Sequence, residues 1–235
     1  MKNPRKCSDK TFAIVPAYNE EKNIAEVIHR LKKIGIDTIV VDDHSGDNTA
    51  AMARANGAKV INLKQNMGKG RAMRAGLDYV LKNHPGAKYI VFIDADMQYD
   101  PSYAKKMIDL LKSGRYDFVT GYRQWSNVPF RHKLGNFVWR STFNTFFGTK
   151  FKDTNCGIMA LRREAIEKIK DSITGGYIIE NSMFVEALNN KLRIEQVPVK
   201  VAYRKISGMK RGIKTVGGVL WFIVKKGIDY RLGRK

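Results

Sequence analysis

Short apolar segments alternate with amphipathic helical segments through the first 120 residues, and this order constrains the fold more than any other feature. Segments with the length and composition of buried strands lie at 12–15, 38–41, 59–63, 89–93 and 117–120. Between them apolar residues recur at helical spacing, as from Ile24 to Leu31. A β-α-β-α-β order predicts an α/β fold with a mainly parallel sheet and helices on both faces.

Polar side chains follow three of these strands at the point where each strand ends. Tyr18, Asn19 and Glu20 follow the first strand, Asp42 and Asp43 the second, and a segment from Asp94 to Gln98 the strand at 89–93. In open parallel sheets ligands bind beyond the carboxyl ends of the strands. We therefore expect these three clusters to meet in one crevice.

The segment Asp94-Ala-Asp96-Met-Gln98 offers two carboxylates and an amide oxygen at alternate positions. Mg²⁺ and Mn²⁺ prefer such hard oxygen ligands and keep open positions for water and phosphate oxygens. A solvated acidic turn is the alternative. The preceding buried strand and the neighbouring polar clusters favour the metal site.

The second half of the chain is more basic and more aromatic than the first. The net charge is +21, and residues 200–235 contain eleven Lys or Arg but a single acid, Asp229. Such charge attracts polyanions: nucleic acid, anionic lipid or phosphorylated substrates. The longest apolar stretch, 216–224, is shorter than the roughly 20 residues of a membrane-spanning helix. Only two cysteines occur, without metal-ligand spacing, and no secretory signal is visible, which favours a reducing compartment.

Several motifs resemble those of the inverting family 2 glycosyltransferases, which have the GT-A fold. These motifs are Val15-Pro-Ala-Tyr-Asn-Glu20, Val41-Asp-Asp-His-Ser-Gly-Asp-Asn-Thr49, Gly68-Lys-Gly70 and Asp94-Ala-Asp-Met-Gln98. Later segments, Gly121-Tyr-Arg123, Asp153-Thr-Asn-Cys-Gly157 and Val197 to Arg204 with Lys210, resemble the dolichyl-phosphate hexose synthases. Those enzymes move one sugar from a nucleotide donor to a polyprenyl phosphate.

The resemblance implies roles for individual positions in the donor site. The residues expected to bind the nucleotide sugar are Pro16, Tyr18, Glu20, Val41, Asp43, Asp94, Ala95, Asp96, Arg204 and Lys210. Asp94, Asp96 and Gln98 would hold Mg²⁺ or Mn²⁺ against the diphosphate. Arg204 and Lys210 would neutralise the leaving diphosphate from the other side.

The same resemblance places Arg123 and Arg131 at the acceptor phosphate, which a guanidinium can bind bidentately. Asp96, Arg123 and Arg204 are the expected catalytic residues. A phosphate acceptor is already ionised near neutral pH, so positioning and charge neutralisation supply most of the acceleration. Asp153 could orient a reacting group or simply stabilise its turn. Glu180 could lie near the sugar or be an acid at a helix N-terminus.

The expected organisation is an N-terminal extension (1–10), a GT-A transferase domain (11–211) and a basic amphipathic tail (212–235). The tail carries Trp221 and Phe222 between cationic residues, which suits a helix in the plane of an anionic bilayer; packing on the core is the alternative. We therefore expect a peripheral protein on the cytoplasmic face of a membrane, with a membrane-protein partner or a second copy as further possible partners.

Two alternatives to a polyprenyl-phosphate hexosyltransferase remain at this stage. One is a family 2 transferase acting on a saccharide hydroxyl, with Asp153 or Glu180 as base. The other is a non-enzymatic nucleic-acid-binding module, although clustered acids at strand ends would repel phosphates. For the donor, Gly68-Lys-Gly-Arg-Ala resembles the glucose-type synthases more than the mannose-type. A UDP-sugar of a hexose or N-acetylhexosamine is therefore favoured, with GDP-mannose next.

Overall fold

The computed structural model describes residues 10–124, 130–173, 178–202 and 209–233, without the side chains of 130–134 and 209–216. Within these ranges the strands form one seven-stranded sheet in the order β3-β2-β1-β4-β6-β5-β7. The strands are β1 (Lys10–Ala17), β2 (Asp37–Asp42), β3 (Lys59–Asn62), β4 (Ala87–Ile93), β5 (Phe118–Arg123), β6 (Ile158–Arg162) and β7 (Ile194–Val199).

The sheet is mainly parallel, as the sequence predicts. β1 pairs in parallel with β2 and β4, β2 with β3, and β5 with β7. The exception is β6, which lies antiparallel between β4 and β5. β6 is not among the strands predicted from the sequence. Because β6 runs against its neighbours, its first residues and the preceding loop at 153–157 lie at the edge where the parallel strands end.

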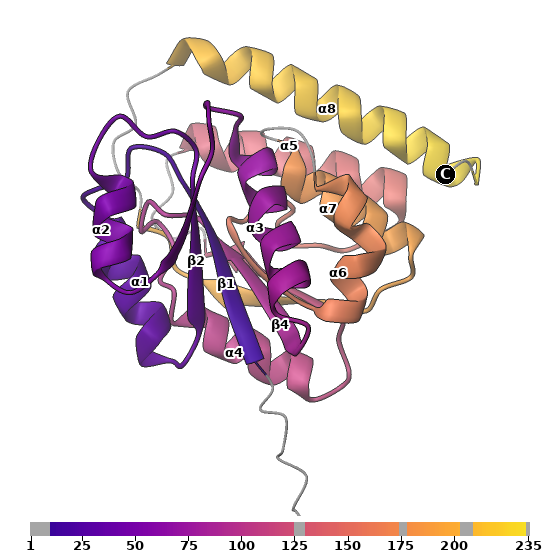
Figure 1. The fold of residues 1–235 in the computed structure, drawn as a ribbon. Helices are drawn as coiled ribbons and strands as arrows, with labels where there is room; N and C mark the ends of the chain where they lie inside the picture. The colour runs from indigo at the N-terminus through magenta and orange to yellow at the C-terminus, as the bar shows by residue number, and fades with distance from the viewer. Residues whose placement is uncertain (1–9, 125–129, 174–177, 203–208, 234–235) are drawn as a thin grey trace, which may run out of the picture.

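Helices cover both faces of the sheet, and each face has its own apolar core (Figure 1). One face is covered by α1 (Ile24–Lys33), α2 (Thr49–Ala55) and α4 (Tyr103–Lys112). The other is covered by α3 (Lys69–Asn83), α6 (Arg163–Ile169) and α7 (Ile179–Asn189). The helical pattern seen in the sequence explains α1, because its buried residues are Ile24, Val27, Ile28 and Leu31. A short 3-10 turn, η2 (Lys170–Ser172), joins α6 to the segment before α7.

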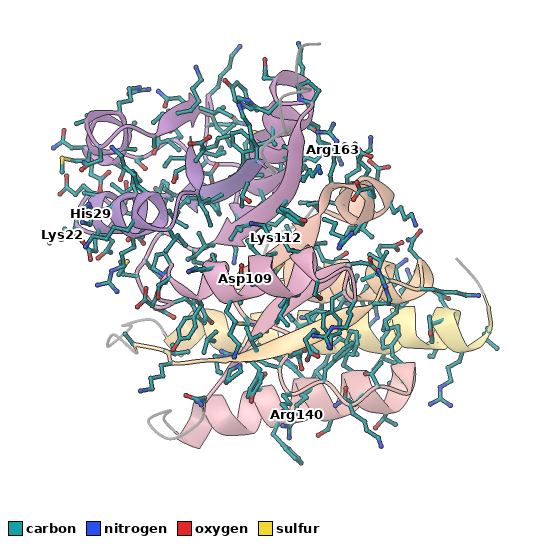
Figure 2. All side chains as sticks on the ribbon, turned by 90° about the horizontal axis from the view of Figure 1, so that it is seen from below. Lys22, His29, Asp109, Lys112, Arg140 and Arg163 are labelled. Atoms are coloured by element: carbon teal, nitrogen blue, oxygen red, sulfur yellow. The ribbon has the colours of Figure 1, made fainter. Side chains whose placement is uncertain are left out.

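Two long helices, α5 (Phe130–Phe147) and α8 (Met209–Arg231), lie side by side at one end of the molecule (Figures 1 and 2). Gly227 of α8 permits a close approach, because a Cβ there would lie 2.5 Å from the Cβ of Phe146. The guanidinium of Arg231 donates to the backbone carbonyls of Thr145 and Phe146 at the end of α5. The predicted tail is therefore helical, and it begins at Met209, inside the range assigned to the transferase domain.

The helix α8 has an inner and an outer face. Val219 and Ile223 are buried in the core, whereas Trp221 is 65% exposed. Packing on the core therefore holds for one face of the tail, and the membrane interpretation stays a prediction for the other face. Among the described residues, no helix is long and apolar enough to cross a lipid bilayer.

Candidate functional site

A crevice opens between β1 and β4 at the carboxyl edge of the sheet. The pairing of β1 with β4 ends at Ile14 and Phe92, whereas its pairing with β2 continues to Ala17 and Asp42. Pro16 has no N–H to extend the ladder. The chain order also reverses at β1, since β2 and β3 lie on one side and β4 on the other. Such a switch point is where open α/β sheets bind ligands.

A cavity occupies this crevice, and it gathers most of the predicted donor-site residues. Its lining consists of Pro16, Ala17, Tyr18, Glu20, Asp43, Lys69, Ala72, Asp94, Ala95 and Asp96. The three polar clusters thus meet, as expected from the strand ends. Val41 and Gln98 are predicted site residues outside this lining.

Two loops beside the cavity are locked together by hydrogen bonds. The backbone N–H of Asn19 donates to Ser45 Oγ at 2.9 Å, and the N–H of Gly46 donates to Asn19 Oδ1 at 2.8 Å. The N–H of Glu20 donates to Thr49 Oγ1 at 2.8 Å. Asn19 adopts a φ of 56°, a left-handed conformation that asparagine tolerates better than most residues. This network fixes the backbone that carries Tyr18 and Glu20.

The alternation of side chains along β2 decides what Val41, Asp42 and Asp43 do. The side chain of Val41 is fully buried beneath Asp43, against α3, so it does not line the cavity. Asp42 lies on the opposite face and accepts a hydrogen bond from Ser45 Oγ at 2.5 Å. Asp43 accepts the N–H of Met67 at 2.7 Å and the N–H of Gly68 at 2.8 Å. Asp43 therefore holds the loop before α3 while one side of it faces the cavity.

Lys69 joins two acids from distant parts of the chain. Its Nζ lies 2.6 Å from Asp94 Oδ1, at the end of β4, and 2.6 Å from Glu180 Oε1, in the first turn of α7. Burial opposes the charge on Lys69, but the two carboxylates outweigh it and raise the pKa of the ammonium well above its ordinary value. Lys69 therefore remains charged in the cavity.

Asp96 lies in a strongly negative environment. Burial raises the pKa of its carboxyl to about 6, and the charges of Asp94 and Glu20 act in the same direction, against the hydrogen bond from the N–H of Gln98. That N–H lies 3.0 Å from Asp96 Oδ1. A cation in the cavity would relieve this repulsion.

The donor set suits a divalent cation in part. Asp94 and Asp96 both face the cavity and offer hard oxygen ligands. Within the described residues, however, no three His, Cys, Asp or Glu side chains lie close enough to hold a metal by themselves. Mg²⁺ usually binds through one or two carboxylates plus water and substrate phosphates. Two aspartates therefore fit an ion that shares its ligands with a diphosphate.

Arg123, the predicted ligand of the acceptor phosphate, is held by a buried aspartate. Its Nε lies 2.7 Å from Asp153 Oδ2 and its Nη2 lies 3.0 Å from Asp153 Oδ1. Asn136 Oδ1 accepts a further hydrogen bond at 3.3 Å. The side chain of Asp153 has no exposed surface. Asp153 thus holds the guanidinium of Arg123, and it also accepts the N–H of Asn155 at 3.0 Å within its own turn.

Three predicted site residues cannot be located. Arg204 lies outside the described residues, and so do the side chains of Arg131 and Lys210, which belong by their backbone to α5 and α8.

Conversely, sequence reasoning did not assign Lys69 or Gly157 to the site. A lysine at the first position of a helix is unfavourably placed against the helix dipole, and this signal could have identified Lys69. Both residues belong to motifs quoted for the resemblance, Gly68-Lys-Gly70 and Asp153 to Gly157, but neither was given a role there.

The family model described as "Glycosyl transferase family 2" matches residues 12–170 of this chain. A UDP-N-acetylglucosamine–dolichyl-phosphate N-acetylglucosaminyltransferase of Methanococcus voltae is 31% identical, over 88% of this chain and 91% of that protein. A polyprenol monophosphomannose synthase of Mycolicibacterium smegmatis is 28% identical, over 97% and 90%.

Among solved structures, glucosyl-3-phosphoglycerate synthase of Mycobacterium tuberculosis in complex with Mn²⁺, UDP-glucose and phosphoglyceric acid has a similar fold. The TM-score is 0.75 at 21% identity, covering 94% of this chain and 81% of that one.

Proposed function

We propose that this chain, which belongs to glycosyl transferase family 2 and is a glycosyltransferase, moves one sugar from a nucleotide-diphosphate donor to a polyprenyl phosphate. The observation that carries the proposal is the cavity between β1 and β4, where Asp94, Asp96 and Lys69 face one another. Its donor side and its acceptor side are supported by different residues. The alternative of a non-enzymatic nucleic-acid module is wrong, since the chain is an enzyme.

For the donor, the position and charge of the cavity support a nucleotide diphosphate. Tyr18 and Glu20 border it on a backbone that the hydrogen-bonded loops hold in place. The first turn of α3 borders it too, and a helix N-terminus favours phosphate. The UDP-sugar names of the M. voltae transferase and of the M. tuberculosis complex favour UDP over GDP, in keeping with the Gly68-Lys-Gly-Arg-Ala segment. The sugar itself is a hexose or an N-acetylhexosamine.

For the metal, Asp94 and Asp96 are the residues that would hold Mg²⁺ or Mn²⁺, with Gln98 close by in the chain. When bound, the ion would neutralise charge on the leaving diphosphate. Lys69 adds a positive charge beside Asp94, 2.6 Å from its Oδ1. The three remaining candidate groups, Arg204, Lys210 and Arg131, are proposed to contact the diphosphate and the acceptor.

For the acceptor, the state of the two candidate bases favours a phosphate over a saccharide hydroxyl. Asp153 is buried and paired with Arg123, and Glu180 is paired with Lys69. A hydroxyl acceptor needs a base to take its proton, whereas an ionised phosphate does not. Arg123, fixed by Asp153 and Asn136 at the end of β5, then serves as the cation that orients the acceptor phosphate.

We also propose that the outer face of α8 meets an anionic membrane surface on the cytoplasmic side. Trp221, Lys225, Ile228 and Leu232 follow helical spacing along this face, and the Nζ of Lys225 lies 5.0 Å from the centre of the Trp221 ring. On α5, Phe137 is 55% exposed, and the guanidinium of Arg140 lies 5.5 Å from the centre of its ring. Arg140 points away from the sheet (Figure 2). Aromatic and basic side chains together are typical of helices at the lipid interface. In this proposal residues 212–235 are the membrane-facing part, 11–211 the transferase domain and 1–10 an extension.

The test is a transfer assay with purified protein and Mn²⁺. Radiolabelled UDP-glucose, UDP-N-acetylglucosamine and GDP-mannose are each offered with polyprenyl phosphate in detergent or with an oligosaccharide. We expect label in the organic phase with a UDP-sugar and polyprenyl phosphate only. Label in the oligosaccharide alone would overturn the acceptor, and transfer from GDP-mannose alone would overturn the base. Equal transfer with and without EDTA would overturn the metal.

A further inference from the structure

Lys69 is held by two carboxylates that come from distant parts of the chain. Its Nζ lies 2.6 Å from an oxygen of Asp94 and 2.6 Å from an oxygen of Glu180. Asp94 directly follows β4, and Glu180 lies in the first turn of α7. The three residues therefore connect the end of a central strand to two helices.

Each partner needs this contact for its own reason. Lys69 is the first residue of α3, where the positive end of the helix dipole disfavours a cation. The side chain of Glu180 is only 7% exposed, and a buried carboxylate is costly unless it is paired. Among the described residues, Lys69 is the cation paired with Asp94, which acts on Asp96 together with the charge of Glu20. The two ion pairs of Lys69 therefore stabilise the ammonium, Glu180 and Asp94 together.

The carboxylate of Asp94 is also confined on its other side. A Cβ at Gly157 would lie 2.0 Å from Asp94 Oδ2, so only glycine leaves room for that oxygen. The backbone N–H of Asp94 donates to the carbonyl of Gly157 at 3.1 Å. One oxygen thus faces the Gly157 backbone and the other faces Lys69. A divalent cation that binds Asp94 Oδ1 must therefore share this oxygen with the ammonium or displace it.

We propose that Lys69 is a positioning residue that competes with the divalent cation for Asp94. When a donor diphosphate binds, Lys69 releases Asp94 to the cation. The proposal rests on the proposed donor and metal site. Phosphate oxygens give the ammonium a new partner, and Glu180 keeps it within the cavity while Asp94 turns to the cation. Binding of the cation and binding of the nucleotide then reinforce each other through Lys69, by the same factor in both directions.

The first measurement is the affinity for Mn²⁺ without nucleotide, from the loss of the free-ion signal in electron paramagnetic resonance. In Lys69→Met the competitor is gone, and we expect Mn²⁺ to bind at least about fivefold more tightly, within the usual range of such couplings. The control is Lys59→Met, which removes one positive charge at the start of β3, at the opposite edge of the sheet. Because it tests charge alone, we expect it to change the affinity less than twofold.

Glu180→Gln supplies a second test with the opposite sign. Without Glu180 the ammonium remains on Asp94, so Mn²⁺ should bind at least about threefold more weakly, and this effect should vanish when Lys69→Met is also present. The matched control is Glu186→Gln, which removes one acid from the same helix. A purely structural role for the pair predicts that Lys69→Met and Glu180→Gln both weaken binding.

UDP gives the third measurement, the enhancement of Mn²⁺ binding by saturating nucleotide. We expect this enhancement to be several-fold smaller in Lys69→Met than in the unmodified protein. Unchanged or weaker Mn²⁺ binding in Lys69→Met would overturn the competition, and the proposed transfer reaction would still stand on its own assay. Absence of Mn²⁺ binding in every variant, with or without UDP, would overturn the competition and the proposed metal together.

Discussion

The cavity edge and the α5–α8 pair are held together by different forces. At the cavity edge, backbone N–H groups donate to side-chain oxygens of other loops, as Glu20 does to Thr49 and Gly68 to Asp43. Between α5 and α8, side chains pack closely: the rings of Phe147 and Tyr230 lie 5.1 Å apart, and Gly227 lies against Phe146. Arg231 adds hydrogen bonds to two backbone carbonyls at the end of α5.

This difference indicates what each region is suited to do. Directional hydrogen bonds fix atoms closely enough to position reacting groups. Ring packing fixes a helix against its neighbour and leaves the opposite face of that helix open to a partner. Variants at the cavity edge should therefore lose transfer activity or donor affinity. Variants in the α5–α8 pair should lose stability or binding to a surface.

The largest effect is expected at Asp96. Asp96→Ala removes a proposed metal ligand from a side chain that faces the cavity, so kcat/KM should fall at least about 100-fold, as when a main electrostatic group is lost. The melting temperature should stay the same or rise, because the substitution relieves the repulsion from Asp94 and Glu20. Near-normal turnover by a folded variant would refute the metal assignment.

Gly157→Ala should give the next largest effect, through Asp94. The added Cβ would lie 2.0 Å from Asp94 Oδ2 and 2.9 Å from a ring carbon of Tyr99, so the carboxylate must move. We expect the affinity for the UDP-sugar with Mn²⁺ to fall about 30-fold, or about 2 kcal/mol. Gly135→Ala, whose Cβ meets nothing within 4 Å on α5, is the control and should leave the affinity unchanged.

The parallel half of the fold could be predicted because period and strand ends are local properties of the sequence. The strands before Pro16 and Asp94 are continuous apolar runs, and the polar residues after them meet in space because parallel strands end at one edge. β6 was missed although its apolar run, Ile158 to Leu161, is as long as those of the predicted strands, because methionine and alanine in that run are not typical of strands. Its position between β4 and β5 depends on tertiary pairing.

Site roles were harder to predict than site positions. Val41 was expected at the nucleotide, and this stays a prediction for its backbone, because its side chain is fully buried in the core beside α3. The contact of Lys69 with Glu180 spans 111 residues, and no spacing rule reports it.

The net positive charge was expected to attract polyanions, but some of the cations have partners within the protein. Arg163 (Figure 2) donates to carbonyls at the end of α3, and Arg162 to carbonyls at and after the end of α4. These cations stabilise helix ends within the protein.

A smaller effect, on stability alone, is expected at the seam between α5 and α8. Gly227→Ala places a Cβ 2.5 Å from Phe146. Overpacking destabilises the protein and the higher helix propensity of alanine stabilises it, so the free energy of unfolding should fall by about 1 kcal/mol. Gly217→Ala is the same change in the same helix, with nothing within 4 Å, and should stabilise the protein by up to about 1 kcal/mol. Urea unfolding measures both. If the two variants shift stability alike, the seam is not closely packed; donor affinity should be unchanged in each.

The smallest effect is expected on the outer face of α8. Trp221 is 65% exposed and packs mainly against the ammonium of Lys225, so Trp221→Ala should leave the melting temperature and the donor affinity unchanged. Binding to vesicles of anionic phospholipid should weaken by roughly threefold, because one aromatic side chain contributes part of an interfacial anchor. Met52→Ala, an exposed apolar residue on α2, is the control. Co-sedimentation at low salt measures both variants, and equal recovery of Trp221→Ala and the unmodified protein with the vesicles would contradict the proposed membrane-facing surface.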